Sequence, residues 1–284
     1  MESRNPVLRR FTEQEESGKA GFAYDEGRSA YAAAAGAEAA TAPTAEQLQG
    51  IYDTPGPGTG RLTIDDVLVK TGISFVILVI GAVIGWNLFE TMPVVVWLMS
   101  LVGFGLAMVN IFKKKVSPPL ILAYAFTEGI FLGGISNWYN TLAIANNYEG
   151  IVQQAVIGTL VAFGVMLALY KSRIIKVNGT FAKMMIVAMV SYLVIALASF
   201  VAALFGVGGG WGFYGVGTLG IVLCVFGVGL AAFSLCLDFE SITQAINHGA
   251  PESESWRLAF GLMVTLIWLY LEILRLLAIL SNNR

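Results

Sequence analysis

Residues 258–280 read LAFGLMVTLIWLYLEILRLLAIL, an apolar run interrupted by two charged side chains, Glu272 and Arg275. A helix rises about 1.5 Å per residue, so about 20 mostly apolar residues cross the roughly 30 Å of hydrocarbon in a bilayer. A continuous run of this length therefore predicts a membrane-spanning helix.

The same kind of run occurs repeatedly along the chain. Hydrophobic residues make up 56% of the sequence and charged residues 13%, whereas globular domains have about 45–50% and about 25%. A β-barrel would show segments of about 10 residues with alternating hydrophobicity, which these continuous runs lack. We predict an all-α membrane protein with a seven-transmembrane-helix bundle over residues 61–284. The other six expected spans are residues 69–89, 94–112, 119–142, 151–170, 184–205 and 215–237.

The first 60 residues have a different character. They hold 5 Lys/Arg and 9 Asp/Glu, include an alanine-rich stretch at residues 32–41, and end in the breakers Pro55, Gly56, Pro57 and Gly58. Such composition cannot bury enough apolar surface to form a core, so we expect residues 1–60 to be a disordered tail. Thr63, followed by acidic residues, is the expected N-cap of the first span.

Basic residues in the short loops predict the orientation. Lys113, Lys114 and Lys115 lie between spans two and three, and Lys171, Arg173, Lys176 and Lys183 lie between spans four and five. The other short loops up to span six contain no Lys or Arg, and Lys and Arg resist translocation. We therefore expect a multi-pass plasma-membrane protein with a cytoplasmic N-terminal tail and an external C-terminus.

Four ionisable residues fall inside the expected bundle: Glu128 in span three, Asp238 at the inner part of span six, and Glu272 and Arg275 in span seven. An ionisable side chain inside a span costs at least about 2.5–3.5 kcal/mol on insertion scales, so it usually faces a partner or a cavity and is a candidate functional residue. Glu128 has no basic residue in its span. It is either protonated and hydrogen-bonded or it lines a water-filled cavity, and we interpret it as a candidate carboxylate of an ion path.

The spacing of the other three residues suggests a gate. Glu272 and Arg275 are three residues apart and can pair on one helix face. Asp238 and Glu272 flank an expected hairpin with a break near residues 249–254, so antiparallel packing would place the two carboxylates at similar depth. Two such carboxylates could share a proton or hold a Ca²⁺ ion. Two simpler readings stay open: Asp238 as an interfacial residue, and Glu272–Arg275 as a self-neutralising pair.

Several other classes of protein are disfavoured by the sequence. The net charge of −2 gives no basic patch for nucleic acid. His248 is the only histidine, and the two cysteines, Cys224 and Cys236, lack the spacing of a metal or disulfide motif. With no recognisable nucleophile–base constellation, we expect neither an enzyme nor a bound cofactor, apart from Ca²⁺ as a permeant or bound ion.

Three motifs resemble the Bax inhibitor-1 family of membrane proteins, in particular its bacterial, actinobacterial branch. They are AFTEGIFLGGIS at residues 125–136, LDF at residues 237–239 and LYLEILRLL at residues 269–277. The resemblance covers about residues 62–281, although NPVLRR at residues 5–10 is also similar to the start of actinobacterial members.

The resemblance implies a seven-helix bundle with a central last helix that acts as a pH-sensitive Ca²⁺ leak channel. The family's pair of pH-sensing aspartates maps onto Asp238 and Glu272, although the second position here is Glu. The family's gating arginine on helix two has no counterpart, since residues 94–111 contain no Arg or Lys. Arg275 is our candidate substitute.

Two hypotheses from different classes follow. The first is a pH-sensitive Ca²⁺ leak channel in which Asp238, Glu272 and Arg275 form the gate. The second is a non-transporting adaptor in the bilayer that regulates another membrane protein, such as a membrane protease.

Overall fold

The structure is a computed structural model, and it describes residues 60–282. The expected disorder of residues 1–60 therefore lies almost entirely outside the described residues. The described part has seven long α-helices, each long and apolar enough to span a membrane. They are α4 (Ile64–Thr91), α5 (Pro93–Phe112), α6 (Pro118–Ala145), α7 (Ile151–Lys171), α8 (Gly179–Leu204), α9 (Gly217–Asn247) and α10 (Glu254–Asn282), with short 3₁₀ turns η1 (Val207–Gly210) and η2 (Gly212–Gly215).

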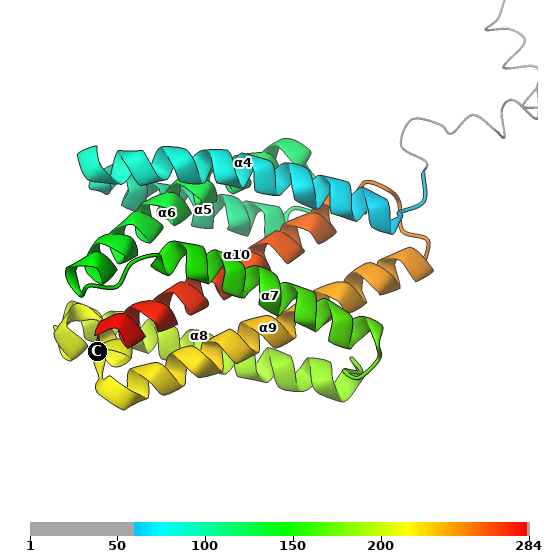
Figure 1. The fold of residues 1–284 in the computed structure, drawn as a ribbon. Coiled ribbons are helices and arrows are strands. Elements are labelled where there is room, and N and C mark those ends of the chain that lie inside the picture. Colours follow the sequence, from blue (N-terminus) through cyan, green and yellow to red (C-terminus); the bar gives the residue numbers. More distant parts are fainter. Residues whose placement is uncertain (1–59, 283–284) are drawn as a thin grey trace, which may run out of the picture. The chain divides into compact units, whose positions relative to one another are not determined.

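These helices confirm the predicted all-α fold and the seven spans. Thr63 caps α4 as expected, since its hydroxyl accepts from the Asp66 amide while the Asp66 carboxylate accepts from the Thr63 amide. α10 packs against α9, α4, α7 and α6, so the last helix is the central one (Figure 1). Large apolar side chains such as Val83, Leu101 and Phe200 are exposed on the outer helices. They suit contact with lipid, and the protein is a multi-pass membrane protein.

Glycines bring α4 and α6 into backbone contact. A Cβ on Gly85 would lie 1.9 Å from the carbonyl oxygen of Ile130, and a Cβ on Gly133 would lie 1.9 Å from that of Ala82. Small residues spaced four apart let membrane helices approach this closely. Gly81 and Gly129 complete the two pairs, with Cβ positions 2.5 Å and 2.2 Å from backbone oxygens of the facing helix.

Three contacts between segments far apart in the sequence mark one end of the bundle, which we call the basic end. The Leu62 amide donates to the Ala250 carbonyl at 2.9 Å, so the start of α4 lies against the α9–α10 connection. Arg257 Nη2 donates to the Lys114 carbonyl at 2.8 Å, and Tyr170 donates to Glu240 Oε2 at 2.9 Å. The two basic loops predicted from the sequence therefore lie at the same end as the α9–α10 connection.

Candidate functional site

Asp238 lies in α9 and faces α10. Its Oδ1 is 3.8 Å from the position that a Cβ on Gly261 would take, and Thr265, whose hydroxyl donates to the Gly261 carbonyl at 3.2 Å, lies close to its carboxylate. Its Oδ2 is buried and has no hydrogen-bond partner. Within residues 60–282, no ion pair includes Asp238. A buried carboxylate oxygen without a donor is costly and therefore suited to take up a proton or a cation.

Glu272 and Arg275 form a buried ion pair on α10. Arg275 Nη1 lies 3.3 Å from both carboxylate oxygens of Glu272. The indole of Trp268, one turn earlier on the helix, donates to Glu272 Oε1 at 3.1 Å. The Glu272 side chain is 3% exposed and that of Arg275 is 27% exposed. The predicted pairing on one helix face is confirmed, and Glu272 is the more deeply buried partner.

Aromatic side chains surround this ion pair. The Arg275 guanidinium lies 4.5 Å from the ring centroid of Tyr214, within cation–π range. Tyr214 donates to the hydroxyl of Tyr192 at 2.9 Å. Tyr139 from α6 lies close enough to Arg275 to interact with it electrostatically. The charge pair is therefore enclosed by aromatic groups from α6, α8 and η2.

The backbone near Tyr214 depends on one glycine. Gly212 has φ +63, and a Cβ there would lie 2.1 Å from the Ser199 carbonyl oxygen. The next amide, that of Phe213, donates to Ser199 Oγ at 3.0 Å. These contacts tie η2 to α8 and hold Tyr214 over Arg275.

A small cavity lies beyond Tyr214, at the end of the bundle opposite the basic end. Its volume is about 190 Å³. Tyr214 and Trp211 line it together with the amides Asn146 and Asn282 and the glycines of the η1–η2 segment. Tyr214 thus both lines this cavity and contacts Arg275.

The structure does not bring Asp238 and Glu272 together. Glu272 faces Gly227 on α9, where an added Cβ would lie 2.7 Å from Glu272 Oε2, whereas Asp238 faces Gly261 on α10. Gly227 and Asp238 are 11 residues apart on α9, and Gly261 and Glu272 are 11 residues apart on α10. At 1.5 Å per residue, this separation corresponds to roughly 16 Å along the helices. A proton shared directly by the two carboxylates is therefore excluded.

The same separation rules out a Ca²⁺ ion held jointly by Asp238 and Glu272, because Ca²⁺–oxygen distances are about 2.3–2.6 Å. Residues 60–282 contain no group of three or more His, Cys, Asp or Glu side chains that could hold a metal ion. The physical reason for the error is the position of the hairpin. α9 ends at Asn247 and α10 already begins at Glu254, so the turn is centred several residues before Ser255. Equal depth of Asp238 and Glu272 would require a turn centred at Ser255, which lies midway between them.

Glu128 lies at a different interface. An added Cβ on Gly103 of α5 would lie 2.5 Å from Glu128 Oε2, so the carboxylate points at α5. α5 packs mainly on α6 and α4, and Glu128 takes part in no ion pair among the described residues. The structure thus separates Glu128 from the α9–α10 interface that carries the other three residues.

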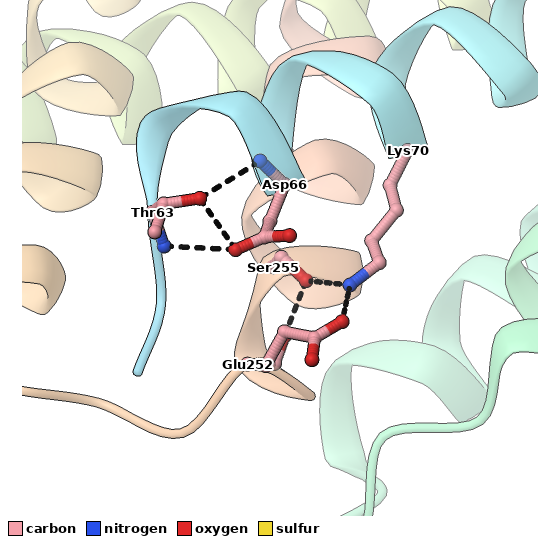
Figure 2. Close-up of polar contacts among 5 residues, drawn as sticks. All are labelled: Thr63, Asp66, Lys70, Glu252 and Ser255. Carbon is pink, nitrogen blue, oxygen red and sulfur yellow. Dashed lines mark hydrogen bonds and ion pairs between the residues drawn. The ribbon is translucent and has the colours of Figure 1, made fainter. Parts of the chain in front are cut away.

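Sequence reasoning missed a fifth charged residue in the bundle, Lys70 of α4. Its ammonium donates to Glu252 Oε1 at 2.9 Å and to Ser255 Oγ at 2.7 Å (Figure 2). It also lies 6.0 Å from the ring centroid of Trp256. The sequence did mark Lys70 as unusual, because it is a charged residue in the second turn of an otherwise apolar span. Its partners could not be inferred from local sequence, because they lie 182 and 185 residues further along the chain.

Lys70 and Ser255 do not have the geometry of a nucleophile and its base. Ser255 is fully buried, and its hydroxyl donates to the backbone carbonyl of Glu252 while accepting from Lys70. A catalytic serine instead donates toward its base.

Comparison with known proteins gives one result that bears on the whole chain. A family model described as Bax inhibitor 1 like matches residues 5–282. The match begins at residue 5, so it includes most of the N-terminal segment that we expected to lie outside the resemblance. No curated protein matches the chain. Because the match spans nearly all of the sequence, the chain belongs to the Bax inhibitor 1 like family.

Proposed function

We propose that this protein is a pH-sensitive cation leak channel with Ca²⁺ as its principal cation, and that the path follows the α9–α10 interface. The observation that carries the proposal is the buried Oδ2 of Asp238, which has no hydrogen-bond donor inside an apolar bundle. An ionisable group in a span is stabilised by a partner, a proton or a cation. Asp238 can therefore alternate between binding a proton and binding a cation.

In this proposal Asp238 and the Glu272–Arg275 pair act at two separate levels. The Glu272–Arg275 pair lies in the interior beyond Asp238, and because its two charges balance, its barrier to cations is the closely packed ion pair itself rather than a net positive charge. Glu272 holds Arg275 in place, and Tyr214, which also lines the 190 Å³ cavity, lies against its guanidinium. We infer that this layer is the outer barrier and that Asp238 is the inner cation and proton site.

Protonation at Asp238 competes with cation binding there. The groups that face Asp238 from α10 are Gly261 and the neutral Thr265. On α9 the thiol of Cys236 lies close enough to interact electrostatically with Asp238. Since the neighbouring groups from α10 are uncharged, the charge at this level depends on Asp238 itself.

For the orientation, we propose that the protein lies in the plasma membrane with its basic end facing the cytoplasm. The support is the clustering of the Lys113–Lys115 loop and the α7–α8 loop at that end, beside the α9–α10 connection. Positively charged short loops are retained on the cytoplasmic side. The cavity and the end of α10 then lie on the outer side.

We expect Asp238→Asn to abolish the pH dependence of Ca²⁺ flux into proteoliposomes. For one titrating carboxylate, the ratio of the deprotonated to the protonated form changes about tenfold per pH unit. Asparagine keeps the shape of the side chain but has no titratable proton. Flux is measured with an entrapped Ca²⁺ dye at several pH values. Glu240→Gln is the matched control, because Glu240 lies on the same helix but is already bonded to Tyr170 and Gln244.

An unchanged pH profile in Asp238→Asn would contradict the role of Asp238. Absence of flux in the wild-type protein would contradict the channel altogether. That second outcome would favour the adaptor, which is tested by isolating a stable membrane-protein partner from cells.

A further inference from the structure

We propose that Lys70, Glu252 and Ser255 form a latch that ties the start of α4 to the α9–α10 connection and restrains the inner ends of both path helices. Its regulatory part rests on the proposed channel function. The latch itself is a conformational device that exists independently of what the protein conducts.

The latch consists of side-chain and backbone contacts between segments far apart in the sequence. Lys70 donates to Glu252 and Ser255, as Figure 2 shows. Beside it, the Leu62 amide donates to the Ala250 carbonyl and the Glu252 amide donates to the Gly60 carbonyl, both at 2.9 Å. The chain before α4 thus pairs with the connection as a short antiparallel bridge.

Two of the three latch side chains, Lys70 and Ser255, are largely shielded from water. The Lys70 side chain is 14% exposed, and Ser255 is completely buried. Leu62 and Val67 pack with Ile242 of α9 in an apolar cluster at the same place. A lysine released from its partners here would be an unpaired cation next to apolar side chains, which is costly. The Glu252 side chain is 43% exposed, so the latched arrangement is favoured mainly by the shielded Lys70 ammonium and the buried Ser255 hydroxyl.

The position of the latch connects it to the proposed path. The restrained connection, residues 248–253, joins the end of α9 to the start of α10. Asp238 lies nine residues before the end of α9, or about 13 Å along the helix. If the inner ends of α9 and α10 separate to open the path at Asp238, the connection must move relative to α4. That movement requires Lys70 to leave Glu252 and Ser255.

The test is hydrogen–deuterium exchange of the full-length protein in nanodiscs, combined with Ca²⁺ flux at neutral pH. The reporter is the amide of Leu62, which is bonded across to Ala250. Glu252→Gln and Lys70→Met are each expected to speed its exchange about tenfold, since a hydrogen bond to a charged group contributes that much or more to an equilibrium. Both are expected to raise flux at neutral pH several-fold.

Glu254→Gln is the matched control. Glu254 is a carboxylate two residues away, but it pairs with Arg257 on its own helix and not with α4. It should leave both measurements unchanged. The double charge swap Lys70→Glu with Glu252→Lys is expected to restore slow exchange, which also separates loss of the latch from a general failure to fold.

Exchange at Leu62 that stays at the wild-type rate in Glu252→Gln and Lys70→Met would overturn the latch. Equal acceleration in Glu254→Gln would overturn it as well, because the effect would not depend on α4. Faster exchange with unchanged flux, in a wild-type protein that conducts, would overturn its regulatory role. If the wild-type protein does not conduct, the proposed function fails and faster exchange still supports the latch.

Discussion

Arg275→Met is expected to lower the free energy of unfolding by about 3–5 kcal/mol, because removing one member of a buried ion pair leaves the other charge unpaired. Glu272 would keep the Trp268 indole as a hydrogen-bond donor but lose its only ion-pair partner among the described residues. Its side chain is 3% exposed, so water cannot take the place of the guanidinium. Reversible unfolding in bicelles measures the loss.

The double variant Arg275→Met with Glu272→Gln separates the cost of an unpaired charge from the loss of packing. With both charges removed, most of the lost stability should return, since a buried pair contributes little net stability compared with neutral groups of similar shape. A double variant as unstable as Arg275→Met alone would show that the contact of Arg275 with Tyr214 dominates instead.

The same helix offers a matched control for this experiment. Glu254 and Arg257 have the same three-residue spacing on α10, but their side chains are 31% and 46% exposed. Exposed pairs contribute about 0–1 kcal/mol, so Glu254→Gln, which removes this pair but keeps the hydrogen bond from Arg257 to the Lys114 carbonyl, should cost no more than about 1 kcal/mol. A large loss in this control would mean that the position on α10, rather than burial, determines the effect.

Gly85→Ala is expected to destabilise the bundle by about 3 kcal/mol or more, at the upper end of the usual cost of overpacking. The added methyl group would lie 1.9 Å from the Ile130 carbonyl oxygen, and that atom belongs to the backbone of α6. A side chain can rotate out of such a clash, whereas here the whole helix has to move. Thermal unfolding and the yield of monodisperse protein measure the effect.

Gly72→Ala, on the same helix, is the control for Gly85→Ala. Gly72 is exposed and has no atom within 4 Å of its Cβ position. Since glycine inside a helix is less stable than alanine by roughly 0.5–1 kcal/mol, this variant should be neutral or slightly more stable. Equal destabilisation by both substitutions would contradict the assignment of Gly85 to a close backbone contact.

The two sets of variants concern interfaces with different roles. α4 and α6 meet backbone to backbone at Gly85 and Gly133, which leaves no room for rearrangement. α9 and α10 meet through side chains at Gly227 and Gly261, where Glu272 and Asp238 occupy the space beside the glycines. The close backbone contact makes α4 and α6 the more rigid pair, so if the protein is the proposed channel, we expect its movement at α9 and α10.

Much of the fold could be predicted from local sequence. The apolar run at residues 258–280 has the length of a span, and α10 contains it with four further residues at its start. Thr63 was recognisable as a cap, and Glu272 and Arg275 as a pair, because both arrangements depend on residues three apart on one helix. Interactions within one helix follow from the helical period alone.

The sequence by itself thus determined the spans, the cap at Thr63, the Glu272–Arg275 pair and the family. Only the tertiary structure decided that Asp238 and Glu272 lie about 16 Å apart and that Lys70 has partners in Glu252 and Ser255. The reason is physical. Hydropathy and helical period describe one segment at a time, whereas the register between two helices depends on where the connecting turn ends and on which small residues let the backbones approach.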